Sequence, residues 1–164
     1  MDTKKNYFTT GQMRNALIQI EDQMVHSNWM PSIILGINRG GCIPGVYLSY
    51  RLKISYQSID IRFCDAVWRS SASTLRDKTR KPNLFALEKA FTNEDKILII
   101  DKINATGATF QYVIDNFGKQ YKKIRFAALI HNKQSKVATD YQGYEIDMSK
   151  DPSWNVFPWE DWDK

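Results

Sequence analysis

Length, composition and charge exclude several classes of protein. With 164 residues, 43% hydrophobic and 25% charged, the chain suits one folded domain over 1–164 and is not wholly disordered. No apolar run approaches the roughly 20 residues of a membrane span, the first residues lack a signal-peptide pattern, and two cysteines without a CxxC pair predict neither a disulfide framework nor a zinc site. We therefore expect a cytoplasmic protein without membrane contact.

The net charge of +5 at pH 7 favours anionic partners, which include nucleic acids, phosphorylated metabolites and acidic proteins. The charge is uneven: residues 69–81 contain five basic residues and one acid, whereas 140–164 contain seven acids and two lysines. A solvated loop is the simplest interpretation of the basic run. Nucleic-acid binding is disfavoured, because the basic residues gather in one loop and no RNA-binding signature is present.

The first part of the chain predicts two helices and two strands. A capping-box pattern predicts a helix over 11–25. Residues 32–37 form a short apolar run bounded by proline and glycine, which predicts a strand buried on both faces. Pro44 suits the start of a second helix over 45–52, and the alternating pattern of 55–63 predicts a second strand.

The rest of the chain continues the alternation of strands and helices. Residues 64–83 show no periodicity, which predicts a flexible functional loop. A short helix over 84–91 precedes the clearest strand of the chain, 96–101; apolar spacing then predicts a helix over 110–117 and another strand over 123–130. Strands alternating with helices predict an α/β fold whose central, mostly parallel sheet is flanked by helices. Residues 154–162, which include three tryptophans, have neither period and predict a packed extension.

Two loops lie where an open parallel sheet binds ligands, beyond the carboxyl ends of its strands. In residues 105–109, two threonine hydroxyls, a glycine that admits close approach and a helix N-terminus together favour a phosphate. In residues 39–41, an arginine and two glycines suit a second anion. The alternatives are an ordinary N-cap turn and a tight turn with a surface arginine. A ligand with phosphates at two ends would use both loops, and the basic loop could close over it.

Three segments resemble a known family. Residues 97–109 resemble the loop that binds 5-phosphoribosyl-1-pyrophosphate (PRPP) in type I phosphoribosyltransferases: four apolar residues, two acids, two variable residues, then Asp-Thr-Gly-any-Thr. Residues 37–45 resemble the pyrophosphate loop of the bacterial xanthine-guanine enzymes. Residues 147–161, with Trp154 and Pro158-Trp159-Glu160, resemble their C-terminal purine-binding hood. The chain thus resembles type I phosphoribosyltransferases, with a hood over about 133–164.

The resemblance implies transfer of a phosphoribosyl group from PRPP to guanine, hypoxanthine or xanthine, with release of pyrophosphate, as in purine salvage. It also implies Mg²⁺ carried with PRPP and a homo-oligomer, a dimer or a tetramer. The implied site comprises the 5-phosphate cradle Thr106, Gly107, Ala108 and Thr109; the pyrophosphate-binding Arg39, Gly40 and Gly41, often with an unusual peptide bond at that step; Asp101 on the ribose hydroxyls and as a metal ligand; the base-binding Lys133, Trp154 and Asn155; and Arg69 and Arg76 of the flexible loop.

Two residues depart from the family pattern. Lys102 replaces the second acid, which weakens recruitment of magnesium, since that ion prefers carboxylate and phosphate oxygens. Ala105 replaces the later aspartate, the usual general base, whose loss costs about 10²–10⁴ in rate where that step matters. Two hypotheses follow: an active transferase with an altered site, or an impaired relative that binds PRPP, a nucleotide or another phosphorylated ligand as a sensor or decoy.

Overall fold

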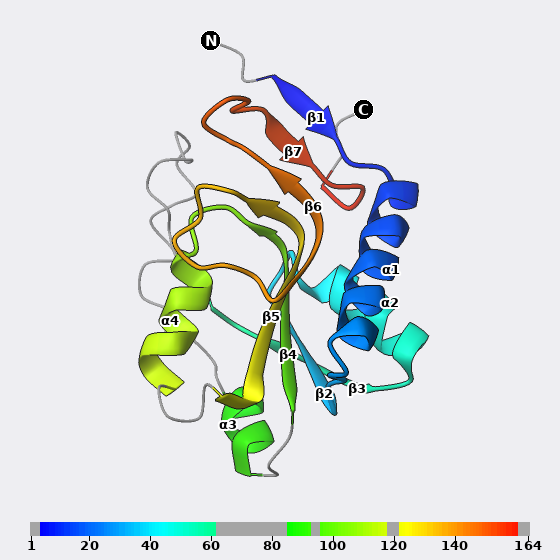
Figure 1. The fold of residues 1–164 in the computed structure, drawn as a ribbon, viewed down its shortest axis with the longest axis vertical. Helices are drawn as coiled ribbons and strands as arrows, with labels where there is room; N and C mark the ends of the chain where they lie inside the picture. Colours follow the sequence, from blue (N-terminus) through cyan, green and yellow to red (C-terminus); the bar gives the residue numbers. More distant parts are fainter. Residues whose placement is uncertain (1–3, 62–84, 93–95, 118–121, 161–164) are drawn as a thin grey trace.

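The computed structural model describes residues 4–61, 85–92, 96–117 and 122–160. The elements in these ranges are β1 (Lys5–Tyr7), α1 (Thr10–His26), β2 (Ile33–Ile37), α2 (Cys42–Leu52), β3 (Ser55–Ile59), α3 (Phe85–Thr92), β4 (Ile97–Asn104), α4 (Ala108–Phe117), β5 (Ile124–Asn132), β6 (Tyr141–Ile146) and β7 (Trp154–Val156). Figure 1 shows their arrangement. The loop predicted over 64–83 lies outside the described residues.

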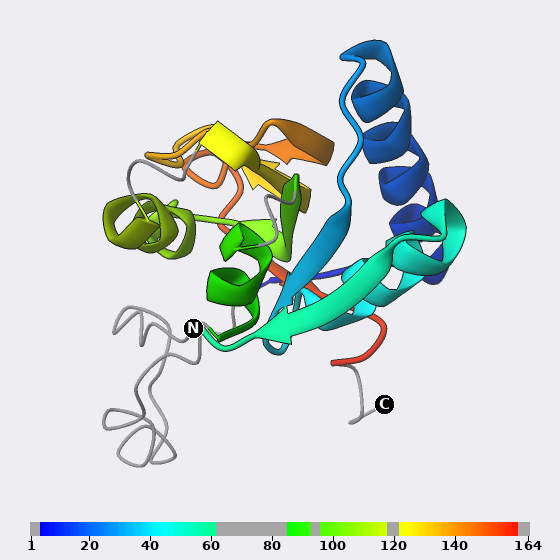
Figure 2. The ribbon, with the colours of Figure 1, turned by 90° about the horizontal axis from the view of Figure 1, so that it is seen from below.

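The main sheet has five strands in the order β3-β2-β4-β5-β6, and every neighbouring pair in it is parallel. Helices α1 and α2 cover one face of this sheet, and α3 and α4 cover the other (Figures 1 and 2). This arrangement confirms the predicted α/β class. It also matches the rule that parallel sheets are covered on both faces.

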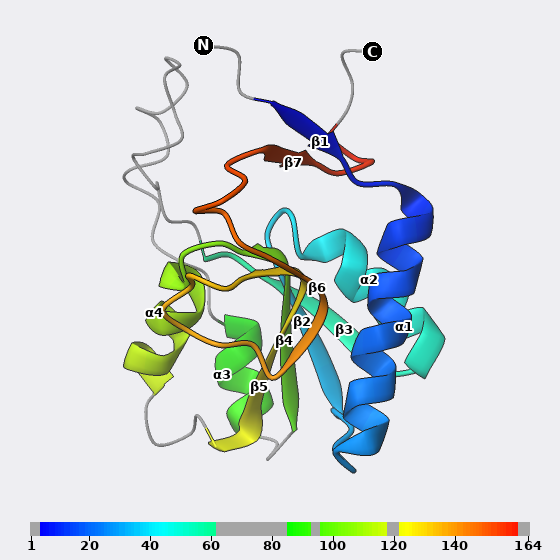
Figure 3. The same ribbon diagram turned by 45° about the horizontal axis from the view of Figure 1, so that its top comes forward.

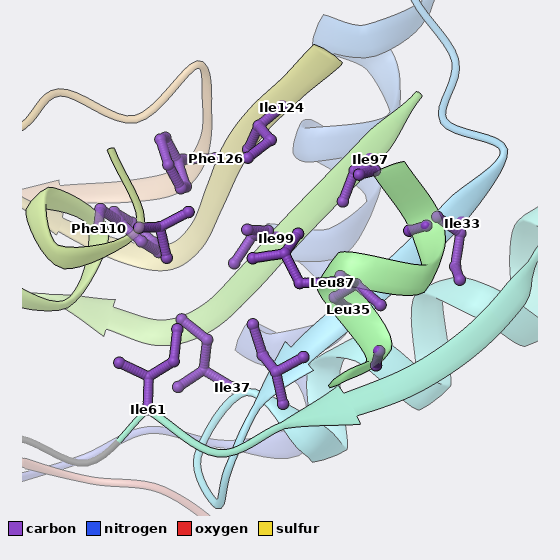
Figure 4. Packing of buried hydrophobic residues seen from close by; sticks show 14 of the residues in the cluster. Ile33, Leu35, Ile37, Ile61, Leu87, Ile97, Ile99, Phe110, Ile124 and Phe126 are labelled. Atoms are coloured by element: carbon purple, nitrogen blue, oxygen red, sulfur yellow. The ribbon is translucent and has the colours of Figure 1, made fainter. Parts of the chain in front are cut away.

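The two-residue period of the central strands builds both layers of the core. On β4, Ile97 and Ile99 belong to the cluster beneath α3 and α4, whereas Leu98 and Ile100 belong to the cluster beneath α1 and α2. Figure 4 shows the first cluster, with Leu87 of α3 among the strand isoleucines. All five of these side chains are fully buried, and each contributes about 1.5–3 kcal/mol through removal from water.

Helix α4 is held to the sheet by an aromatic stack. Phe110, in its first turn, stacks on Phe126 of β5 with ring centroids 4.5 Å apart and planes 27° apart, and Figure 4 shows the two rings facing each other. Both rings are buried. This contact anchors the N-terminal end of α4, which follows the predicted phosphate loop.

The predicted helix over 11–25 is confirmed as α1, and its capping box is present. The Gln12 backbone N–H donates to Thr9 Oγ1 at 3.1 Å, and the Thr9 N–H donates to Gln12 Oε1 at 2.8 Å. The second helix begins earlier than predicted, at Cys42, because Gly41 already has a right-handed helical conformation. The strand predicted over 55–63 ends at Ile59 in β3.

The packed extension predicted at the C-terminal end contains a strand, and two further strands were not predicted. β6 completes the edge of the main sheet, and β7 pairs in parallel with β1 to form a separate two-stranded ribbon. Figure 3 shows this ribbon above the turn between β2 and α2. The two ends of the described chain thus meet over the edge of the sheet at which the two candidate loops lie.

Candidate functional site

The two predicted anion loops lie at the same edge of the sheet. β2 and β4 are parallel neighbours, with Gly36 opposite Ile100, so the turns that follow them leave from the same edge. The first turn also contacts the second strand directly: a Cβ added at Gly41 would lie 2.2 Å from the Ile100 carbonyl oxygen and 3.0 Å from the Asp101 Cα. Only glycine permits this approach, so the first turn packs directly against β4, the strand that leads into the second turn.

The 105–109 turn has the conformation of an anion cradle. Gly107 has a φ of +85°, a region that L side chains rarely adopt. The Thr106 Oγ1 accepts the Ala108 backbone N–H at 3.3 Å, and the Gln111 N–H donates to the Gly107 carbonyl at 2.8 Å as α4 begins. A pocket of about 190 Å³ is lined by Asp101 and residues 103–110. The amides at the start of α4 therefore border a cavity that could admit a phosphate.

The last residue of β5 and the segment that follows it hold this turn by hydrogen bonds and close packing. The Asn132 side-chain amide donates to the Ala105 carbonyl at 2.7 Å, and the Lys136 backbone N–H donates to the Thr106 carbonyl at 3.1 Å. A Cβ at Gly107 would lie 2.7 Å from the backbone nitrogen of Val137. The turn therefore has its shape because a second segment of chain holds it.

Asn104 and His131 form a buried polar pair beside this support. The Asn104 amide nitrogen donates to the Val137 carbonyl at 2.7 Å and lies 3.2 Å from His131 Nδ1. Because the amide nitrogen is a donor, Nδ1 accepts and the ring proton lies on Nε2. Burial lowers the pKa of His131, which favours this neutral form. Sequence reasoning missed Asn104 and Asn132, since an asparagine after a strand also suits any ordinary turn.

The first turn carries its arginine toward solvent. Arg39 is exposed, and the peptide bond between Asn38 and Arg39 is cis. The resemblance implied an unusual peptide bond at the step of Arg39 and Gly40, and the cis bond lies one residue earlier. Asn38 Oδ1 accepts the Cys42 thiol at 2.8 Å, which ties the turn to the first residue of α2. The guanidinium therefore remains available to an anion, and its role in pyrophosphate binding stays a prediction.

The carboxyl group of Asp101 has a raised pKa. Burial raises its pKa to about 7, and Glu160 adds to this rise; the Lys102 backbone N–H, which donates to Asp101 Oδ1 at 2.7 Å, and the Lys102 charge partly oppose it. The carboxyl group lines the pocket beside the phosphate turn. A carboxyl group with this pKa can donate a hydrogen bond to a ligand when it is protonated and accept one when it is ionised.

Lys102 points away from this pocket toward the C-terminal segment. Its ammonium forms an ion pair with Glu160 and lies 5.2 Å from the centroid of the Phe157 ring. Its methylene stem lies against the first turn: a Cβ added at Gly40 would be 2.6 Å from Lys102 Cδ. Phe157 in turn stacks on Trp159, at 5.1 Å between centroids. Sequence reasoning placed Glu160 only in the motif that resembles the hood and did not predict its contact, or that of Phe157, with Lys102, because both residues are distant from Lys102 along the chain.

The donor set does not fit a magnesium ion held by the protein. In the part of the chain that the structure describes, no three His, Cys, Asp or Glu side chains are grouped to hold a metal. The second family carboxylate is an ammonium here, and Asp101 alone of that pair can offer oxygen ligands. Magnesium that arrives with PRPP stays a prediction.

The predicted base-binding residues have other partners in this structure. The Lys133 ammonium lies 3.0 Å from Glu145 Oε1, and Asn155 Oδ1 accepts the Asn6 amide at 3.0 Å. Trp154 is 41% exposed on β7. None of the three lines the pocket of 190 Å³, and their role in base binding stays a prediction. Arg69 and Arg76 lie outside the described residues.

Among the described residues, no helix combines the length and the apolar character that a membrane span needs. A parallel sheet covered by helices on both faces, with two glycine-containing turns at one carboxyl edge, defines the class of α/β proteins that bind ligands at that edge. The family follows from the sequence comparison: the phosphoribosyl transferase domain matches residues 4–161, and the chain belongs to this family.

Solved structures of known proteins share the fold over nearly the whole chain. A purine phosphoribosyltransferase from Pyrococcus horikoshii Ot3 is 25% identical, with a TM-score of 0.68, and 98% of this chain covers 97% of that one. A xanthine-guanine-hypoxanthine phosphoribosyltransferase from Helicobacter pylori is 16% identical, with a TM-score of 0.68 and coverage of 98% and 95%. A hypothetical protein from Neisseria gonorrhoeae with bound ppGpp is 15% identical, with a TM-score of 0.72 and coverage of 99% and 93%. At these last two identities the likeness shows the fold alone.

Proposed function

We propose that this protein transfers a 5-phosphoribosyl group from PRPP to a purine base: guanine, hypoxanthine or xanthine. In this reaction the bond from the ribose C1 to the pyrophosphate oxygen breaks and a bond from C1 to a base nitrogen forms. The base loses a proton, and pyrophosphate leaves. The observation that carries the proposal is that both anion turns leave the same edge of the sheet, with the first turn packed against the strand that leads into the second.

Different residues bind the two ends of PRPP. The turn from Thr106 to Thr109 presents backbone amides and hydroxyls to the 5-phosphate, while Arg39 and the adjacent glycines hold the pyrophosphate. Asp101 lines the cavity beside the turn that binds the 5-phosphate. Its carboxyl group forms hydrogen bonds with the ribose hydroxyls. Because Ala105 offers no base, the proton of the purine passes to solvent or to the departing pyrophosphate.

The test is nucleotide formation. The full chain is incubated with PRPP, Mg²⁺ and each of the three bases, and products are separated by chromatography. We expect a nucleotide from at least one base, at a rate lowered by the missing general base, about 10²–10⁴-fold below an enzyme that has it. An Arg39→Ala variant with unchanged melting temperature serves as control and should form less product. No nucleotide above the no-protein background with any of the three bases contradicts the proposal.

A second candidate is a binding protein for PRPP, a nucleotide or a related phosphorylated ligand. Lys102 and Ala105 favour it, because both replace acids that the family pattern places in the catalytic loop. The neighbour of the same fold with bound ppGpp makes guanosine polyphosphates a reasonable ligand to try. Calorimetric titration distinguishes the two candidates: tight binding of PRPP or ppGpp without any nucleotide formation supports the second.

A further inference from the structure

We propose that Lys102 is the protein's own cation for the diphosphate group and that it leaves Glu160 to bind this group. The inference rests on the proposed function, since it assumes that a diphosphate binds at the Arg39 turn. It adds a metal-independent mode of binding, in which an ammonium takes the place that the family pattern gives to a carboxylate.

The position of the Lys102 side chain carries the first step. Its stem crosses directly over Gly40: a Cβ there would lie 2.6, 2.8 and 3.1 Å from Lys102 Cδ, Cγ and Cε. The ammonium is one bond beyond Cε, so it lies at the Arg39 turn itself. An anion held by that turn would therefore meet two cationic side chains, one from the turn and one from β4.

The present partner of the ammonium can be displaced. Lys102 and Glu160 pair at the protein surface, with 21% and 29% of their side chains exposed, so ligand oxygens can reach the ammonium from solvent. A partly exposed ion pair contributes only about 0–1 kcal/mol. A diphosphate carries more negative charge than one carboxylate and offers several acceptors to the three N–H donors of the ammonium.

Phe157 keeps the ammonium in place during this exchange. Its ring lies 5.2 Å from the ammonium and attracts a cation whichever anion balances the charge. Phe157 is fully buried and stacked on Trp159, so its ring is held by the packing around it. Its backbone N–H also donates to Glu160 Oε2 at 3.3 Å, a contact that Glu160 can keep when Lys102 turns to the ligand. A short rotation at the end of the lysine side chain is then sufficient to pass from the carboxylate to the ligand.

The exchange makes Glu160 a competitor of the ligand. Removing its charge should strengthen diphosphate binding, whereas removing the Lys102 charge should weaken it. These effects have opposite signs, and loss of folding in a variant cannot imitate the gain. Because the cation belongs to the chain, binding should persist when divalent ions are chelated.

The experiment is calorimetric titration of the full chain with inorganic pyrophosphate, in EDTA and in Mg²⁺. We expect binding in EDTA, changed by less than about threefold by magnesium. Lys102→Met should weaken binding in EDTA by about tenfold or more, and Glu160→Gln should strengthen it about threefold. Lys102→Asp, which restores the second acid, should bind only with magnesium. Arg125→Met is the matched control, because it also removes a cation from an ion pair, here with Asp140 near the start of β5.

Each outcome decides the inference. Binding by the unaltered chain only in Mg²⁺ overturns it and leaves the proposed function standing. Equal affinities of the unaltered chain and the Glu160→Gln variant overturn the exchange. Absence of binding in both buffers overturns the inference as well, and nucleotide formation in the assay above then decides the proposed function separately. Melting curves of every variant establish that the compared proteins are folded.

Discussion

Replacing Asp101 by asparagine tests the protonation of the carboxyl group at the centre of the site. Burial raises its pKa from 3.8 to about 7. The folded protein therefore holds this proton more tightly than the unfolded chain does. As a consequence, the free energy of unfolding falls as the pH rises from about 4 to about 7, and the contribution is constant above that range.

The magnitude follows from the interval between the two pKa values. At about 1.4 kcal/mol per pH unit, the interval from 3.8 to about 7 corresponds to a ceiling of about 4 kcal/mol. Asp101 is partly exposed, and contact with water reduces this penalty, so we expect about 2 kcal/mol. Asparagine cannot ionise and still offers an oxygen to the Lys102 N–H. Asp101→Asn should therefore be more stable than the unaltered chain by about this amount at pH 8 and equally stable at pH 4.

Chemical denaturation of both proteins between about pH 4 and pH 8 gives the two free energies of unfolding. Their difference isolates Asp101, because His131 and the surface acids titrate in both proteins. Asp115→Asn, an exposed carboxylate on α4, controls for the loss of one negative charge. A difference that stays constant over this pH range, or that favours the unaltered chain at high pH, would refute the reasoning.

Three further substitutions test the structure around the site. Gly107→Ala should destabilise the protein by about 2 kcal/mol and abolish inorganic phosphate binding by calorimetry, because φ is positive and the methyl group would lie 2.7 Å from the Val137 nitrogen. Asn104→Ala removes the buried donor to the Val137 carbonyl and should lower the unfolding free energy in urea by about 1–3 kcal/mol. Gly143→Ala places a methyl group 2.3 Å from the Ala16 Cβ and should lower the melting temperature by several degrees, or about 1–3 kcal/mol.

The central strands and both anion turns could be predicted because their signals are local. The apolar run of 97–100 predicts a buried strand. The turns that follow neighbouring parallel strands lie at the same edge of the sheet in any fold of this class. β6 was missed because its middle residue is Gly143, a poor strand former. That glycine is needed where α1 crosses the sheet, since Ala16 fills the space of a side chain.

The ribbon of β1 and β7 and the ion pair of Lys102 could not be predicted for a different reason. All three residues of β1 are exposed, so no apolar period marks the strand, and its hydrogen-bond partners lie at the other end of the chain, with Lys5 opposite Trp154. The ammonium of Lys102 and its acidic partner are 58 residues apart. Contacts between residues so distant along the chain depend on the whole fold, and no local pattern in the sequence predicts them.

Lys102 and Ala105, the two departures from the family pattern, change the charge of the site in the same direction, because each removes a carboxylate. The pattern places three carboxylates at positions 101, 102 and 105, and a diphosphate beside them needs cations from solution. This chain has one carboxylate, Asp101, with a pKa of about 7, and one ammonium, while Ala105 is neutral. An anionic ligand therefore meets much less negative charge at these three positions than the family pattern would present. An acid at position 105 would place a second carboxylate in the pocket that Asp101 lines, and the alanine there removes that repulsion toward an anionic ligand.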